Sequence, residues 1–187
     1  MALINFTEFV NLVILTIAIG YILSGYIRLP GHFRLGIRKF NWQDFKYSML
    51  IAAPAIVLHE LAHKFVAIGF GLGAIFKIWY PGLAIAVFLK LIASPFLIIA
   101  PGFVEISEAS GNIQGLLIAF AGPAMNLIIW LIAGFILKKK KHLTAFQAST
   151  WIMIKRITIM LFIFNMIPIP PLDGSKVLFN FLKIFSS

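Results

Sequence analysis

Long apolar runs follow one another along this chain, separated by short polar, proline-containing or glycine-containing connections. A helix needs about 20 residues to cross a bilayer, and most of these runs approach or exceed that length. None alternates polar and apolar positions as a barrel strand does. The backbone N–H and C=O groups inside lipid must therefore form their hydrogen bonds within helices. The pattern predicts an all-α, polytopic transmembrane helical bundle with about five to six apolar segments. The runs cover residues 6–27, 47–70, 83–100, 115–137 and 151–168, with a shorter run at 177–185.

The composition agrees with a membrane protein. Hydrophobic residues make up 61% of the 187 residues and charged residues only 12%, which leaves too little polar surface to cover a soluble globule. No long linker, repeat or low-complexity segment divides the chain, so residues 1–187 are interpreted as a single multi-pass integral-membrane domain. The first apolar run has no basic residue before Arg28 and exceeds a signal-peptide core in length, so it is interpreted as a retained span.

The net charge of +10 is concentrated in two basic segments between the apolar runs, at 28–46 and 138–156. Basic residues beside spans usually anchor a protein at lipid headgroups, so we expect the lipid bilayer and not nucleic acid as a partner. Both segments should lie on one side of the membrane, which requires an even number of crossings between them. Three runs separate them. The run at 83–100, flanked by two Pro-Gly pairs and carrying Lys90, is therefore predicted to re-enter the membrane without crossing it.

Residues 59–63 read His-Glu-Leu-Ala-His and lie inside the apolar run at 47–70. Positions i and i+4 share one face of a helix, so His59 and His63 can bind one Zn²⁺ ion through their rings. Glu60 lies beside the metal as a candidate general base for water. Because unpaired polar groups are costly inside a membrane, this motif indicates a working site with one zinc ion per chain.

A third protein ligand is needed, and the absence of cysteine leaves only carboxylates and histidines. The longer metzincin motif fails, because Val66 and Gly69 stand where its glycine and third histidine would be. The remaining candidates occupy span ends, a polar loop or the basic segments: Glu8, Asp44, Glu105, Glu108, His32 and His142. Their positions make them weaker candidates than the one acid that follows a broken apolar helix.

That acid is Asp173, which follows the last long apolar run and a cluster of three prolines at 168–171. A carboxylate at the end of a broken helix can approach a metal at a fixed angle, and with two histidines it leaves the fourth tetrahedral position for water. The alternative interpretation is that Asp173 caps the helix expected from Ser175 onward. In that case Glu105 or Glu108 would be the next ligand to test.

The chain resembles the site-2 protease family of intramembrane zinc metalloproteases. The resemblance rests on residues 59–63, on Gly-Pro-Ala-Met-Asn at 122–126 and on the segment from Asn165 to Gly174, in the family's order. It covers residues from about 50 to 176 and implies three family spans. These are the HExxH span at about 47–70, the Gly-Pro span at about 115–137 and the Asn/Pro/Asp-Gly span at about 151–176.

The resemblance also implies roles for individual residues. His59, His63 and Asp173 would be the zinc ligands and Glu60 the catalytic base, with Asn165 near the catalytic centre. The asparagine of the Gly-Pro motif would be Asn126. Structural alternatives stay open, because both asparagines can bond across helices and Gly122-Pro123 can simply start a helix.

The pattern and the resemblance together predict a zinc-dependent endopeptidase that cleaves within or near transmembrane segments of other membrane proteins. A membrane metal carrier or sensor with the same ligands is the main alternative, and Glu60 distinguishes them because transport needs no base beside the metal. An inactive substrate-binding relative is a third possibility, disfavoured by the complete set of ligands and base. Two arguments about orientation in the membrane disagree. The resemblance places the zinc nearer the cytosolic face, whereas the positive-inside rule places the two basic segments on the cytosolic side instead.

Overall fold

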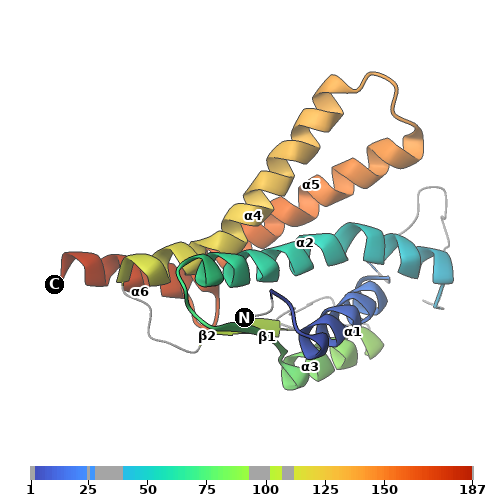
Figure 1. Cartoon of the computed structure of the whole chain (residues 1–187). Helices are drawn as coiled ribbons and strands as arrows, with labels where there is room; N and C mark the ends of the chain where they lie inside the picture. Colours follow the sequence, from blue (N-terminus) through green and yellow to red (C-terminus); the bar gives the residue numbers. More distant parts are fainter. Residues whose placement is uncertain (1–2, 25, 28–39, 93–101, 107–111, 187) are drawn as a thin grey trace.

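The structure is a computed structural model that describes residues 3–24, 26–27, 40–92, 102–106 and 112–186. Within them it contains six helices and one two-stranded sheet (Figure 1). The helices are α1 (Phe6–Leu23), α2 (Trp42–Gly69), α3 (Tyr80–Leu91), α4 (Asn112–Lys139), α5 (Ala145–Asn165) and α6 (Asp173–Phe185). The strands are β1 (Ala74–Ile78) and β2 (Gly102–Ile106). Each predicted apolar run overlaps one helix, although part of the run at 83–100 lies outside the described residues.

Four of these helices, α1, α2, α4 and α5, are long and apolar enough to cross a membrane. With 18 to 28 residues each and a rise of 1.5 Å per residue, they are about 27–42 Å long, close to or above the thickness of a hydrocarbon core. Large apolar side chains on them face outward, among them Phe6 and Phe135, which are 82% and 63% exposed. Lipid would cover these side chains, so the chain is an integral-membrane helical bundle, as predicted.

The α1 helix packs against α2 through side chains that are almost completely buried. Leu15 and Ile19 of α1 meet Ile51 and Ala52 of α2, and Phe76 of β1 joins the same cluster. The close approach of α1 and α2 puts the first helix alongside the helix that carries the HExxH motif. This packing anchors the N-terminal part of the chain to the site.

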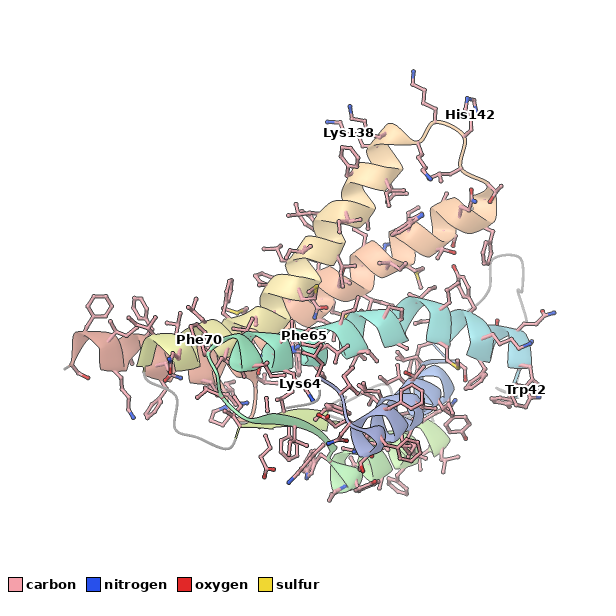
Figure 2. All side chains as sticks on the ribbon, viewed as in Figure 1. Trp42, Lys64, Phe65, Phe70, Lys138 and His142 are labelled. Atoms are coloured by element: carbon pink, nitrogen blue, oxygen red, sulfur yellow. The ribbon has the colours of Figure 1, made fainter. Side chains whose placement is uncertain are left out.

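A buried ion pair holds the strands to the same two helices. The Lys64 ammonium of α2 contacts the Glu8 carboxylate of α1, and these side chains are only 2% and 3% exposed. Glu8 Oε1 also accepts the backbone N–H of Phe76 in β1 at 2.8 Å. Figure 2 shows Lys64 on the side of α2 that faces the strands. Glu8 therefore joins α1, α2 and β1, a role that its position at a span end did not indicate.

Two short strands, which the sequence analysis did not predict, accompany the helical bundle. They pair antiparallel, with Ala74 opposite Ile106 and Ile78 opposite Gly102. In β1, buried and exposed side chains alternate along Ala-Ile-Phe-Lys-Ile, the period expected of a half-buried strand. Glu105, expected in a polar loop, lies in β2 and forms an exposed ion pair with Lys77.

The strand pairing bears on the predicted re-entrant segment. Because Ile78 lies opposite Gly102, the chain leaves the ribbon and returns to the same place. The α3 helix within this excursion has 12 residues and is about 18 Å long, too short to cross a bilayer core. Lys90, at its far end, contacts the backbone carbonyl of Tyr21 and donates to Ser24 Oγ at 2.8 Å, so α3 is fastened to the end of α1.

The α4 and α5 helices form a hairpin whose closed end projects away from the strands (Figure 1). Lys138 and His142 lie at this end (Figure 2). The start of α5 nevertheless contacts the start of α2, because the Tyr47 and Phe146 rings are 5.6 Å apart. The described part of the first basic segment, residues 40–46, and the start of α5 thus lie toward the same end of the bundle.

The predicted boundary of the second basic segment is wrong. Lys155 and Arg156 lie inside α5 instead of in the loop that was expected to extend to residue 156. The Lys155 ammonium lies 5.2 Å from the centre of the Trp130 ring of α4, a cation–π contact that provides a partner for this charge within the hairpin.

Candidate metal centre

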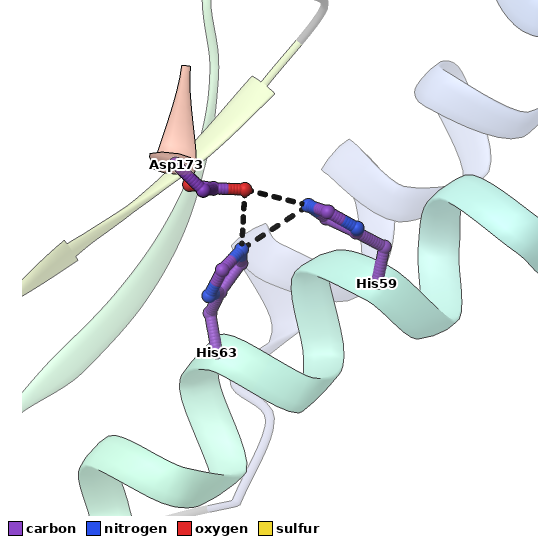
Figure 3. A group of neighbouring side chains, drawn as sticks. All are labelled: His59, His63 and Asp173. Carbon is purple, nitrogen blue, oxygen red and sulfur yellow. Dashed lines mark hydrogen bonds and ion pairs between the residues drawn. The ribbon is translucent and has the colours of Figure 1, made fainter. Parts of the chain in front are cut away.

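The α2 helix presents two histidine rings to the interior of the bundle. His59 and His63 are one turn apart, and their side chains are 7% and 10% exposed. Their Nε2 atoms lie 3.2 Å from each other, and the rings are nearly perpendicular at 81°. Figure 3 shows both rings directed toward one point.

Asp173 completes this group from the first residue of α6. Its Oδ2 atom lies 3.0 Å from His59 Nε2 and 3.2 Å from His63 Nε2 (Figure 3). The capping alternative is wrong, since α6 is preceded by Leu172 at its N-cap and no side chain caps it. A metal ion shared by these three atoms would bind the carboxylate in its ionised form.

The spacing of the three donor atoms fits a tetrahedral zinc ion. Atoms that bind one such ion at 2.0–2.1 Å lie about 3.3 Å from each other, and here the three separations are 3.0, 3.2 and 3.2 Å. Among the described residues, this is the one group of three or more potential ligands close enough to share a metal. Two imidazoles and one carboxylate suit zinc and leave a fourth position for water.

Hydrogen bonds to the far side of each ring orient the two histidines. His63 Nδ1 lies 2.7 Å from the backbone carbonyl oxygen of Ile118 in α4, so Nδ1–H donates and Nε2 is free for a metal. His59 Nδ1 lies 3.0 Å from the side-chain amide of Asn126, also in α4. The Oδ1 atom of this amide is buried and has no partner in the described part of the chain. A half-turn of the amide would bring Oδ1 to His59 Nδ1–H, the arrangement that metal binding through Nε2 requires.

Gly122 belongs to the Gly-Pro motif found in the sequence, but its contact with the histidine pair was not predicted. Gly122 and Pro123 lie within α4, not at the start of a helix as one interpretation held. The α4 helix bends along its length (Figure 1), and proline removes a backbone hydrogen bond where it occurs. A Cβ atom at Gly122 would lie 2.3 Å from His63 Nε2 and 2.6 Å from His59 Nε2. Glycine is therefore required to let α4 approach the histidine pair and to leave the space for a metal.

A cavity of about 240 Å³ opens beside the three donor atoms. Glu60, next to His59 in α2, lines it and so lies where a base for water would be needed. Asn165 lines it as well, with Nδ2 donating to the carbonyl of Leu161 at 3.0 Å. One wall is backbone and side chain of β2, including Gly102 and Phe103.

The other candidate ligands lie elsewhere. Glu8 pairs with Lys64, Glu105 pairs with Lys77, and Asp44 is in the first turn of α2. His142 is at the closed end of the α4–α5 hairpin (Figure 2). Glu108 and His32 fall outside the described residues.

Comparisons with known proteins indicate the family to which this chain is similar. The model of the family described as peptidase family M50 matches residues 136–187. A protein of Methanocaldococcus jannaschii, whose name describes it as a candidate zinc metalloprotease, is 34% identical over 182 residues, covering 91% of this chain and 83% of its own. A Bacillus subtilis protein with the same description is 32% identical over 155 residues, covering 71% of this chain and 67% of its own. No solved structure matches the chain.

Proposed function

The chain belongs to peptidase family M50, the site-2 protease family, and from this premise we propose that it cleaves peptide bonds within or near transmembrane segments of other membrane proteins. Membership makes it a membrane zinc protease. The observation that supports the finer proposal is the depth of the site. His59 and His63 lie about 15 and 9 Å from the C-terminal end of α2, a helix long enough to cross a membrane. A peptide bond that reaches them would belong to a segment in or close to the bilayer.

The residues of the site can be assigned roles in hydrolysis. His59, His63 and Asp173 would hold the zinc ion, whose chemistry is to activate water and to polarise the scissile carbonyl. Glu60 takes a proton from the attacking water and passes it to the leaving nitrogen as the C–N bond breaks. Asn165 has a second amide hydrogen not used by Leu161, and it can donate to the carbonyl oxygen as negative charge develops there.

The strand β2 offers a way to hold a substrate in the required conformation. A helical peptide bond is hidden from attack, so a transmembrane substrate must unwind locally. Within the described residues β2 pairs with β1 alone, and it lines the cavity beside Glu60. An unwound substrate can form backbone hydrogen bonds with the other edge of β2, a common mode of peptide recognition.

The test is Glu60→Gln in purified, zinc-loaded protein with a single-span membrane protein as substrate. We expect zinc content to stay at one ion per chain, because Glu60 is not a ligand, and cleavage to fall by about 10²–10⁴-fold or more. Glu105→Gln, which changes an acid outside the cavity, should cleave normally. Mass spectrometry of the wild-type products should place the cut within or beside the span.

Each alternative has its own result. Cleavage retained by Glu60→Gln would contradict the mechanism. A wild-type protein that binds zinc but cleaves no membrane substrate would favour the metal carrier or the inactive relative. A cut far from the span would retain the protease and contradict the intramembrane part of the proposal.

A further inference from the structure

Lys176 is the one cationic side chain that lines the cavity in the described part of the chain. It lies three residues after Asp173 in α6, so the helix places it nearly one turn away from the carboxylate, on the cavity side. Its Nζ atom is 3.8 Å from Asp173 Oδ1, while the other oxygen of that carboxylate faces the two histidines. The ammonium thus lies just beyond the metal group, over the open space.

The contact with Asp173 is too weak to be the main role of this lysine. The side chain is 58% exposed, and an exposed i,i+3 pair at this distance contributes little to stability. Asp173 already has two nitrogen partners at its other oxygen. Lys176 is therefore free to move its ammonium toward a group that enters the cavity.

The charges that line the cavity indicate what that group is. Glu60 and Asp173 are its only described acidic residues, and the two charges of a zinc ion would balance them. The positive charge of Lys176 is then unbalanced, and it can bind one anionic group of a substrate. Peptide hydrolysis forms such an anion: water oxygen adds to the carbonyl carbon, the C–N bond breaks, and both water protons finish on the leaving amine. The carbonyl carbon then carries a carboxylate.

We propose that Lys176 is a catalytic residue that binds the oxygen atoms of the scissile carbonyl, first as negative charge develops and then as the new C-terminal carboxylate. This inference rests on the proposed protease function. The wall of the cavity that carries Lys176 is α6, and β2 lines the same cavity. A substrate strand on β2 would present its carbonyl to the zinc, with Lys176 within reach of the same oxygen atoms.

Product binding tests this without turnover. The N-terminal product of the model substrate is synthesised with a free C-terminal carboxylate and, separately, as the C-terminal amide. Their affinities are measured for zinc-loaded Glu60→Gln protein and for the same protein with Lys176→Gln, Lys176→Arg or Lys183→Gln. Lys183 is the matched control, since it lies on the same helix over the Phe179 ring and does not line the cavity.

We expect Lys176→Gln to reduce the preference for carboxylate over amide by at least tenfold, with zinc content unchanged. Lys176→Arg should restore most of that preference, and Lys183→Gln should leave it unaltered. With Glu60 intact, Lys176→Gln should lower kcat by roughly 10–100-fold with a smaller change in KM, as for loss of a group that stabilises the transition state.

An unchanged carboxylate preference in Lys176→Gln would overturn the inference. So would equal loss in Lys183→Gln, because that result indicates a general effect of charge. If wild-type protein cleaves and Lys176→Gln cleaves equally well, the inference fails and the protease function stands. If wild-type protein cleaves nothing, the proposed function fails, and the inference fails with it.

Discussion

Replacing Gly122 by alanine should remove zinc binding while leaving the helix intact. The added Cβ would lie 2.3 and 2.6 Å from the two histidine Nε2 atoms, close to the 2.0–2.1 Å at which a zinc ion would lie. The methyl group and the metal would compete for one space. Nonbonded carbon atoms prefer separations of about 3.5–4.0 Å, so the overlap with each ring is about 1 Å. Relief requires either rotation of both rings away from Asp173 or displacement of α4.

We expect zinc affinity to fall at least hundredfold, or about 2.7 kcal/mol or more. The assay is competition for zinc against chelators of graded affinity, with metal content read by mass spectrometry. Gly134→Ala is the matched control on the same helix, because its Cβ would meet only the end of Lys155 at 3.5–3.6 Å. Both changes gain about 1 kcal/mol of helix propensity, so far-UV circular dichroism should remain helical in both.

Normal zinc affinity in Gly122→Ala would refute this reasoning. It would mean that the metal, if bound, does not occupy the space between the Nε2 atoms and α4. Equal loss in Gly134→Ala would show that the effect comes from α4 in general and not from the contact with the histidines.

Three further outcomes follow from the structure. Asp173→Ala should lower bound zinc well below one ion per chain, and full zinc with full activity would contradict its assignment as a ligand. Lys64→Met should lower the free energy of unfolding, measured by denaturant titration, by about 3–5 kcal/mol, because it leaves Glu8 buried and unpaired. Adding Glu8→Gln should recover part of this loss. If the losses of the two single variants simply add in the double variant, the two side chains do not interact as proposed. Single cysteines at Lys77 and Glu105, which precede and follow the excursion through α3, should be labelled from one side of the membrane in a chain with no native thiol. Labelling from opposite sides would contradict the prediction that this segment re-enters the membrane without crossing it.

The helices and the common face of the two histidines could be predicted from the sequence because their signals are local. The i,i+4 spacing of His59 and His63 fixes their common face whatever the rest of the chain does. Asp173 was reached by elimination among few acids, and the structure places its carboxylate beside both rings.

The strands could not be predicted in the same way. Five-residue apolar segments are too short to distinguish from pieces of helix, and β1 needs a partner that starts 24 residues after its own end. The alternation in β1 was present, but it lay between two longer helical runs. Glu105 was therefore placed in a loop, although pairing with β1 holds it in a strand.

A second limit of prediction from sequence concerns contacts between distant elements, as three residues show: Gly122, Asn126 and Lys176. A glycine inside a helical pattern indicates close packing, yet the sequence does not say what packs against it. Contacts between α4 and α2 supply the answer, namely the two Nε2 atoms for Gly122 and His59 Nδ1 for Asn126. Lys176 carried no signal beyond its proximity to Asp173, because its importance depends on the position of the cavity.

The most direct test of the central claim is diffraction from zinc-loaded protein at energies on either side of the zinc absorption edge. The account predicts one anomalous peak per chain, about 2.0–2.1 Å from the Nε2 atoms of His59 and His63 and from Asp173 Oδ2. Glu60 should lie outside the coordination shell, on the side of the open position. A peak elsewhere in the molecule, or a peak that Glu60 coordinates in place of Asp173, would contradict it.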